Sequence, residues 1–305
     1  MTAVSPRLSA PPRLPASPRS VLVGLIGQGV GPSLTPPAHE LEGARHGISY
    51  VYRPIEIEPE DAEPERLGRL LWAARTMGFD GLNITHPVKQ AILPLLDALA
   101  PSAEMVGAVN TVKFTADGLI GHNTDVTGFG TAFDATFGPD GHGRVALFGA
   151  GGAGFAVAAA LVQRGIAELV IVDAVAERAR ELAGRVSGRG VAARGAGLDE
   201  AAALLPSVSG AVNATPFGMA AHPGAAFDVS RLPADAWVSD IVYRPTETAL
   251  LRAARERGLR TMSGLGMVAG QAADAFEIFT GEPADRAAIV DDISDLVAAE
   301  AADPA

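Results

Sequence analysis

Phe148-Gly-Ala-Gly-Gly-Ala-Gly154 is the stretch from which the architecture of this chain can be inferred. An apolar run, 144–148, leads into it, and an alanine-rich segment follows it as far as Arg164. A second apolar run, 169–172, then ends in Asp173. Strand, glycine-rich turn, helix, strand and acid in this order indicate a βαβ unit that binds a dinucleotide, because the glycines admit a pyrophosphate and the helix N-terminus faces its charge.

The acid that closes this unit favours NAD as the cofactor. A carboxylate at Asp173 can accept a hydrogen bond from the adenosine ribose 2′-hydroxyl of NAD, and it would repel the 2′-phosphate of NADP. Ala174 and Val175 supply no cation to offset that repulsion. Arg178 lies one helical turn further on, where it could reach such a phosphate or simply flank the adenine. NADP is therefore the less favoured alternative.

Helices and short strands alternate on both sides of the glycine-rich turn, which predicts an α/β protein of two domains. The second domain is expected to be a doubly wound, Rossmann-type parallel sheet. Two closing helices, 267–280 and 287–301, are too apolar for a free tail, so we expect them to return to the first domain. The expected division is a disordered tail at 1–20, a substrate-binding and catalytic domain at 21–127 plus 267–301, and an NAD-binding Rossmann domain at 128–266.

Composition argues against several classes of protein. The formal charge of −11 does not suit a nucleic-acid surface. The absence of cysteine rules out disulfides and cysteine-bound metal, and the six histidines show no metal-ligand spacing. No apolar run reaches the roughly 18 residues of a membrane span. Residues 1–20 are rich in proline and lack acids, so we interpret them as a disordered tail, not a transit peptide, and expect a cytoplasmic protein.

Gly81-Leu-Asn-Ile-Thr-His-Pro-Val-Lys-Gln90 contains the first candidate catalytic residue. Asn83, Thr85 and Lys89 should lie at or just past the end of a short strand, where polar side chains can line a cleft, and a helix is expected at 91–99. Only two lysines occur in the chain, although it has 24 Lys plus Arg. Lysine can release its proton in a protein and arginine cannot, which makes Lys89 a candidate proton carrier. A plain surface lysine is the alternative.

Other polar residues follow strands or precede helices. Ser33 and Thr35 stand at a helix start, where two hydroxyls and free N–H groups form a neutral anion site. Ordinary N-capping by either residue explains them equally well. A strand at 107–112 is expected to place Asn110 among small apolar residues. Asp125 lies in a polar turn before a helix and, taken alone, would be interpreted as an N-cap.

Together these motifs resemble the shikimate dehydrogenase family. Their order is a hydroxyl pair near the start, N-I-T-H-P-x-K, G-A-V-N-T-V, G-x-N-T-D-x-x-G, the glycine-rich βαβ unit, N-A-T-P-x-G-M and G-x-G-M-x-x-x-Q-A, over residues 21–282. Ser33-Leu-Thr35, in place of the usual Ser-x-Ser, and Asp173 make the chain most similar to the NAD-preferring quinate/shikimate dehydrogenases. Gly31-Pro32 departs from the family pattern and bears on substrate preference.

The resemblance implies a role for each matching residue. Lys89 and Asp125 would be the catalytic pair. The substrate carboxylate would be held by Ser33, Thr35 and Tyr243, and the ring hydroxyls by Thr85, Asn110 and Gln271. The pyrophosphate would lie against Gly149, Ala150, Gly151, Gly152 and Ala153. The adenosine end would contact Asp173 and Arg178, and the nicotinamide side would be lined by Thr215, Ile241, Gly264 and Met267.

These roles predict an oxidoreductase that moves hydride between NAD and the C3 hydroxyl or keto group of shikimate or quinate. Open alternatives are an NADP-dependent shikimate dehydrogenase of aromatic amino-acid biosynthesis and a dehydrogenase of an aminoshikimate-type analogue. A non-catalytic NAD sensor on the same fold is another, although the complete Lys89 and Asp125 pair argues against it. The expected partner is a small carboxylate, without metal, nucleic acid or membrane, and the chain is expected to be a monomer or homodimer.

Overall fold

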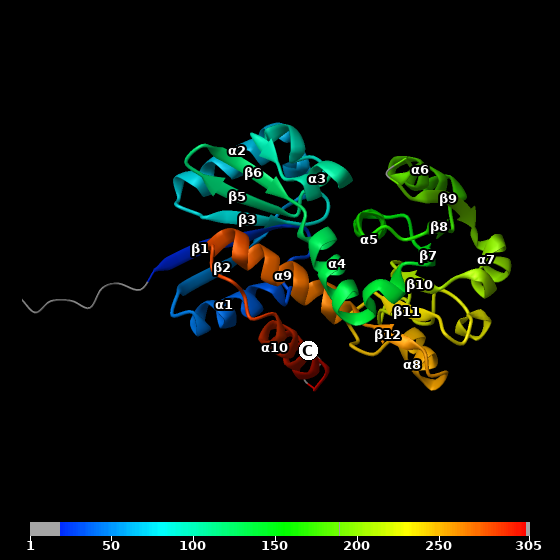
Figure 1. Cartoon of the computed structure of the whole chain (residues 1–305). Helices are drawn as coiled ribbons and strands as arrows, with labels where there is room; N and C mark the ends of the chain where they lie inside the picture. Colours follow the sequence, from blue (N-terminus) through cyan, green and yellow to red (C-terminus); the bar gives the residue numbers. More distant parts are fainter. Residues whose placement is uncertain (1–18, 189, 303–305) are drawn as a thin grey trace, which may run out of the picture.

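The computed structural model describes residues 19–188 and 190–302 and shows two α/β domains, each built on a six-stranded sheet (Figure 1). Of the tail expected at 1–20, residues 1–18 lie outside the described residues. Within the described part of the chain, no helix is both long and apolar enough to cross a bilayer.

The first sheet is mixed and has the strand order β2-β1-β3-β5-β6-β4. The parallel strands β1 and β3 end side by side, with Ile26 paired to Ile84. Strand β5 runs antiparallel to both β3 and β6, so β5 starts and β6 ends at this same edge. The bounds are Ser20–Gly27 for β1, Ser49–Glu56 for β2, Gly81–Ile84 for β3, Ala98–Leu99 for β4, Thr111–Thr115 for β5 and Gly118–His122 for β6. One edge of the sheet therefore collects four chain segments that are far apart in sequence.

The helices of this domain are α1 (Thr35–Arg45), α2 (Pro64–Thr76) and α3 (Pro101–Val106). The helix expected at 91–99 is wrong, because the chain forms turns, a single 3₁₀ turn at Leu93–Leu95 and then β4. Pro94 lacks the N–H that a continuous α-helix requires and its ring crowds the preceding turn. The strand expected at 107–112 begins only at Thr111, after Gly107 ends α3 in the left-handed conformation, with φ of 63°.

The second sheet is parallel throughout, in the order β12-β11-β10-β7-β8-β9. Its strands are β7 (Arg144–Phe148), β8 (Glu168–Asp173), β9 (Ala192–Gly197), β10 (Gly210–Asn213), β11 (Trp237–Asp240) and β12 (Arg260–Met262). Its helices are α5 (Gly152–Gln163), α6 (Ala176–Val186), α7 (Leu198–Leu204) and α8 (Ala249–Glu256). The order reverses at β7, and ligands of such sheets bind at the carboxyl ends of the strands beside that reversal. This sheet confirms the predicted Rossmann-type domain.

The remaining helices are α4 (Thr124–Phe137), α9 (Gly264–Thr280) and α10 (Arg286–Ala302). Figure 1 shows α4 and α9 side by side between the sheets, with α10 next to α9 and α1. Glycines allow the backbones of α4 and α9 to touch, since a Cβ on Gly128 would lie 2.4 Å from the backbone nitrogen of Gln271. The expected return of the closing helices is confirmed.

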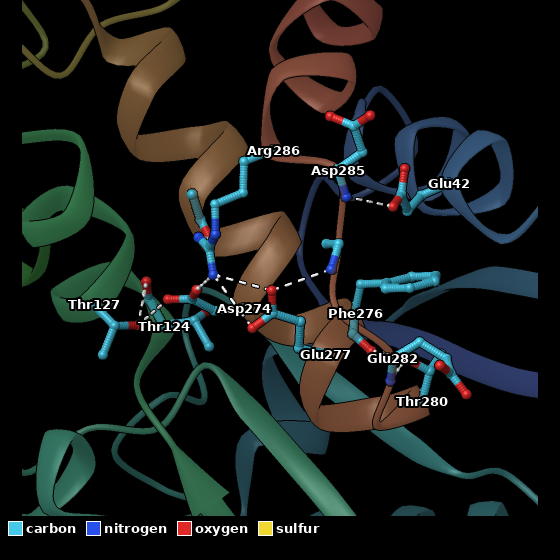
Figure 2. Close-up of polar contacts among 12 residues, drawn as sticks. Glu42, Thr124, Thr127, Asp274, Phe276, Glu277, Thr280, Glu282, Asp285 and Arg286 are labelled. Atoms are coloured by element: carbon cyan, nitrogen blue, oxygen red, sulfur yellow. Dashed lines mark hydrogen bonds and ion pairs between the residues drawn. The ribbon is translucent and has the colours of Figure 1, made fainter. Parts of the chain in front are cut away.

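Polar contacts fix the ends of these closing helices (Figure 2). Arg286, at the start of α10, donates to Asp274 and, at 3.3 Å, to Glu277 of α9. Thr127 of α4 donates to the other oxygen of Asp274. The buried carboxylate of Glu42 in α1 accepts a 2.7 Å hydrogen bond from the backbone N–H just before α10. The helix that carries Gln271 is thus bonded to α4 and to α10, and the start of α10 is bonded to α1.

Candidate active site

A cavity of about 450 Å³ lies where the edge of the first sheet meets α9 and the loop after β11. Every residue predicted to act on the substrate lines this cavity: Ser33, Thr35, Thr85, Lys89, Asn110, Asp125, Tyr243 and Gln271. Three of the predicted cofactor residues, Ile241, Gly264 and Met267, line it as well. Residues spread over most of the chain therefore meet in one space.

The Lys89 ammonium and the Asp125 carboxylate face each other in this cavity. Lys89 Nζ donates a 2.6 Å hydrogen bond to Asp125 Oδ2, with the two side chains 32% and 18% exposed. Lys89 stands in the turn that follows β3, and Asp125 is in the first turn of α4. Asn123, not Asp125, is the N-cap of α4, since its Oδ1 accepts from the backbone N–H of Val126 at 3.3 Å. The Asp125 carboxylate is therefore available to Lys89 and to a bound molecule.

Ser33 and Thr35 lie in the turn that opens α1. The N-cap of this helix is Leu34 and has no side-chain capping bond, so capping does not account for both hydroxyls. Ser33 Oγ accepts a 3.3 Å hydrogen bond from the backbone N–H of Thr35. The two carboxylate oxygens of Glu56 hold the preceding loop by accepting from the N–H groups of Gly29 and Val30, the latter at 3.0 Å.

Arg244 was not among the predicted residues, yet it lines the cavity next to Tyr243. Its Nη2 donates to the carbonyl oxygen of Pro32 at 2.7 Å and to Glu300 of α10 at 3.0 Å. One side chain of the second domain thus contacts the loop that leads to Ser33. The only sequence signal for it was its position directly after Tyr243.

Buried amides and hydroxyls form the floor of the cavity. Asn83 was expected at a cleft and lines it, whereas Tyr52 was not predicted. Asn110 is 4% exposed, and its Oδ1 accepts from the backbone N–H of Thr124 at 2.8 Å. Tyr52 donates to Asn83 Oδ1 at 2.6 Å. Tyr52 could have been found from strand alternation, because Tyr50 and Tyr52 point to the same face of β2.

In the glycine-rich turn between β7 and α5, two glycines are required by close backbone contacts and two face open space. A Cβ on Gly149 would lie 2.7 Å from the Ala214 carbonyl oxygen, and a Cβ on Gly154 only 2.0 Å from the Gly149 carbonyl oxygen. A Cβ on Gly151 or Gly152 would meet nothing within 4 Å. Since α5 begins at Gly152, its free N–H groups face this open space, which fits a pyrophosphate.

Asp173 lies at the end of β8, beside the same turn. Its Oδ2 accepts from the Ala150 N–H at 2.8 Å and its Oδ1 from the Val175 N–H at 2.9 Å. Each oxygen keeps a lone pair for a further donor, such as a ribose hydroxyl. Arg178 is in the first turn of α6, which follows. These residues do not line the 450 Å³ cavity but stand at the carboxyl edge of the second sheet.

The buried carboxylate of Asp240, at the end of β11, joins the loops that follow β10 and β11. Asp240 Oδ1 accepts from Asn213 Nδ2 at 2.9 Å and from the Val242 N–H at 3.0 Å, and Oδ2 accepts from Thr248 at 2.7 Å. Burial raises the pKa of Asp240. Asn213 Oδ1 in turn accepts from Thr215 Oγ1 at 2.6 Å. The predicted Thr215 is therefore held in place relative to the loop that carries Tyr243.

No metal site accompanies these groups: across residues 19–188 and 190–302, no three His, Asp or Glu side chains cluster in a way that could hold an ion. The arrangement provides an amine, a carboxylate and several hydroxyls beside a dinucleotide-type turn. That set suits proton transfer at an alcohol or a ketone.

Comparisons with known proteins agree with this chemistry. Residues 25–112 match the family model described as the shikimate dehydrogenase substrate binding domain, and residues 264–291 match the shikimate 5'-dehydrogenase C-terminal domain. The chain is 50% identical over 281 residues to a shikimate dehydrogenase (NADP(+)) of Streptomyces avermitilis, covering 91% of this chain and 96% of that protein. It is 49% identical over 270 residues to a quinate/shikimate dehydrogenase (NAD(+)) of Corynebacterium glutamicum, covering 86% and 94%.

A solved structure also matches the fold of this chain. The quinate dehydrogenase from Corynebacterium glutamicum in complex with NAD superposes with a TM-score of 0.85 at 44% identity. The match covers 91% of this chain and 99% of that one. The similar proteins thus include both NAD and NADP enzymes.

Proposed function

The chain belongs to the shikimate dehydrogenase family, and we propose that it transfers hydride between NAD and C3 of shikimate or quinate, with Lys89 and Asp125 as the acid–base pair. The observation that carries the proposal is the 2.6 Å Lys89–Asp125 contact inside the cavity. A surface lysine, the alternative interpretation, would not share a cavity with a carboxylate and a row of hydroxyls.

Lys89 transfers the proton in this reaction. NAD, when bound, supplies the hydride acceptor for the carbon that bears the reacting hydroxyl. As that hydride leaves, the unprotonated Lys89 amine takes the hydroxyl proton and passes it to solvent, to which its side chain is 32% exposed. In the opposite direction the Lys89 ammonium donates its proton to the carbonyl oxygen. Asp125 accepts a hydrogen bond from Lys89 and holds the amine in line with the reacting oxygen.

The remaining cavity residues hold the substrate. Ser33, Thr35 and Tyr243 donate to its carboxylate, and the guanidinium of Arg244, which is ion-paired with Glu300, lies next to Tyr243. The ring hydroxyls bond to three other residues that line the same cavity, Thr85, Asn110 and Gln271. Hydroxyl donors bind a carboxylate less strongly than a bidentate arginine does, so the site depends on several of them together.

The cofactor side favours NAD over NADP. Gly149, Ala150, Gly151, Gly152 and Ala153 surround the open space at the start of α5 that fits the pyrophosphate. The Asp173 carboxylate would bond the ribose 2′-hydroxyl of NAD and repel a 2′-phosphate, while Arg178 flanks the adenine. Thr215, Ile241, Gly264 and Met267 lie along the nicotinamide side. In this assignment residues 21–127 with 267–301 act on the substrate and residues 128–266 bind the cofactor.

An initial-rate matrix tests the proposal. Shikimate and quinate are each assayed with NAD and with NADP, and the expected result is turnover of at least one acid with a kcat/KM that is higher for NAD. Higher rates with NADP would favour the second candidate, an NADP-dependent shikimate dehydrogenase, which the identity to the Streptomyces avermitilis protein supports. NAD binding without turnover of either acid would instead indicate a non-catalytic sensor.

A further inference from the structure

Five buried polar residues beneath the cavity form one hydrogen-bonded chain, which we call the floor chain. It runs from α4 through β5 and β3 to β2, and each member is at most 4% exposed: Thr124, Asn110, Thr111, Asn83 and Tyr52. Asn110, Asn83 and Tyr52 also line the cavity. Because each of these side chains is almost fully buried, its hydrogens must be directed to a partner within the chain or to a molecule in the cavity.

The direction of the floor chain is set at its α4 end. The backbone N–H of Thr124 can only donate, and it lies 2.8 Å from Asn110 Oδ1. The Asn110 amide is therefore oriented with its oxygen toward α4. Its Nδ2 donates one hydrogen to Thr124 Oγ1 at 3.0 Å. The second Nδ2 hydrogen is left for the cavity.

The same direction continues through the next two members. Thr111 Oγ1 lies 3.0 Å from Asn110 Oδ1, which can only accept, so the Thr111 hydroxyl donates its one hydrogen there. It must then accept from Asn83 Nδ2, which is 2.9 Å away. The other Asn83 Nδ2 hydrogen goes to the backbone carbonyl of Asn110 at 3.1 Å. Both amide hydrogens of Asn83 are thus used, and its Oδ1 is left as an acceptor.

Tyr52 is the last member of the floor chain, and its hydroxyl hydrogen is already used in a hydrogen bond. The Tyr52 hydroxyl donates to Asn83 Oδ1 at 2.6 Å. Burial raises the pKa of the Tyr52 phenol well above its usual range, so the hydroxyl stays protonated. With its hydrogen in that bond, the Tyr52 oxygen has only lone pairs to offer.

We propose that the floor chain gives the cavity a fixed polarity, in which Asn110 offers the substrate an N–H donor and Tyr52 offers it an oxygen acceptor. This inference rests on the proposed function and adds Tyr52 to the residues that determine specificity, with Asn83 and Thr111 as positioning residues. The substrate oxygen that faces Asn110 accepts a hydrogen bond, and the substrate group that faces Tyr52 must be a hydroxyl that donates one. A ketone or an ether at the Tyr52 position would bring two acceptors together.

Variants that break the chain at two points test the inference. Thr111→Val keeps the shape and removes the hydroxyl, Thr111→Ser keeps the hydroxyl, and Tyr52→Phe keeps the ring. Thr111→Val and Tyr52→Phe should each raise the KM for shikimate about tenfold with a smaller change in kcat, because buried partners are left unpaired. Thr111→Ser should restore most of the affinity. The double variant should raise KM by clearly less than the product of the two effects, because both changes break one chain.

Substrate analogues then identify the substrate hydroxyl that donates a hydrogen bond to Tyr52. The analogue that lacks this hydroxyl, either 4-deoxyshikimate or 5-deoxyshikimate, should have the same KM with Tyr52→Phe as with wild type. An equal KM increase by Tyr52→Phe for shikimate and both analogues would overturn the inference, as would a Thr111→Val variant that behaves like wild type. The dissociation constant of NAD, measured for each variant, shows that the fold is intact. If the wild-type protein turns over neither acid, the proposed function fails; if it does and the variants match it, only the inference fails.

Discussion

The two lysines of the chain show how differently one residue type is used. Lys89 bonds Asp125 in the cavity, whereas Lys113 Nζ donates to the Phe279 carbonyl oxygen at 2.8 Å, in the last turn of α9. A cation at a helix C-terminus is a common stabilising contact. Burial lowers the pKa of Lys113. The rarity of lysine alone does not separate these two uses; the position of Lys89 in a polar motif past the end of a strand does.

Replacing each lysine with methionine separates these roles. Lys89→Met should lower kcat by roughly 10²–10⁴-fold, because a positioned proton carrier contributes about that much, and it should change KM less. Lys113→Met, the matched control, should leave kcat within about twofold. Steady-state rates for both variants check the prediction. A Lys89→Met enzyme with near-wild-type kcat would exclude the proton role.

Asp173 is the residue on which cofactor preference is expected to depend. Asp173→Ala should raise the KM for NAD about tenfold or more, since it removes a charge-assisted hydrogen bond to the ribose and a partner of the Ala150 N–H. The KM for the ring acid should change little. Glu177→Ala removes an exposed carboxylate from the neighbouring helix α6 and should leave both constants unchanged. Equal NAD constants in Asp173→Ala and wild type would refute the ribose contact.

His39 should make stability sensitive to pH. It is 1% exposed, and burial lowers its pKa from 6.5 to about 3. Below pH 6.5 the unfolded chain binds a proton at His39 and the folded protein does not, so stability falls as pH decreases toward 3. The fall is at most about 1.4 kcal/mol per pH unit from this residue. Urea unfolding at pH 8, 6 and 5 should show a smaller fall for His39→Phe, and parallel curves would contradict the assignment.

At the level of elements, the crossing of α4 and α9 determines the geometry of the site, because it places Asp125 and Gln271 on touching helices. A Cβ on Gly128 would lie 2.4 Å from the Gln271 backbone nitrogen, so the backbones must move apart to admit it. Gly128→Ala should destabilise the protein by about 1–3 kcal/mol and lower kcat. The check is thermal unfolding together with steady-state kinetics.

Gly184 provides the control for that substitution. It lies in α6, is exposed, and a Cβ there would meet nothing within 4 Å. Gly184→Ala should stabilise the protein by roughly 0.5–1 kcal/mol, because alanine loses less entropy in a helix. If Gly128→Ala were as harmless as Gly184→Ala, the close crossing would not be required for activity.

Elements with a regular apolar pattern were predictable, and elements with local exceptions were not. β7 has the bounds that the sequence indicated, Arg144–Phe148, and the bounds of β8, α9 and α10 differ from the expected ones by three residues or fewer. Residues 91–99 were wrongly predicted as a helix. The segment is largely apolar, but Pro94 lacks the N–H that a continuous helix requires. The left-handed Gly107 likewise shortened the strand that was expected to carry Asn110.

At the scale of the whole molecule, motifs located most of the residues that line the cavity, including Asn83 and Asn110 of its floor, but not Tyr52 or Arg244. The lining residues predicted from short motifs do meet in one cavity. Tyr52 and Arg244 belong to no such motif, and their roles depend on contacts across long sequence distances, such as Arg244 with Pro32. The Arg244 contact joins the two domains and the Tyr52–Asn83 contact joins β2 to β3, so both depend on how distant segments pack, which no short motif encodes.

Arg244 connects the two domains and should therefore affect the substrate more than stability. Arg244→Met should raise the KM for the ring acid about tenfold, because the Pro32 carbonyl loses a charged donor and the loop that precedes Ser33 loosens. Arg255→Met removes a half-exposed ion pair with Glu247 on the same side of the second domain and should have little effect. Kinetics and thermal unfolding of both variants check this, and identical KM values would contradict it.

The return of α9 and α10 to the first sheet has a consequence for biosynthesis. Residues 138–263 must leave the ribosome before α9 exists to cover β1, β5 and α4. At 5–20 residues per second, that interval lasts on the order of 10 s. During it the nascent first sheet displays an uncovered apolar surface that includes Val23 and Tyr50, which pack against Phe276 and Phe279 in the finished protein. We therefore expect the amino-terminal half to be prone to aggregation until translation supplies its missing helices.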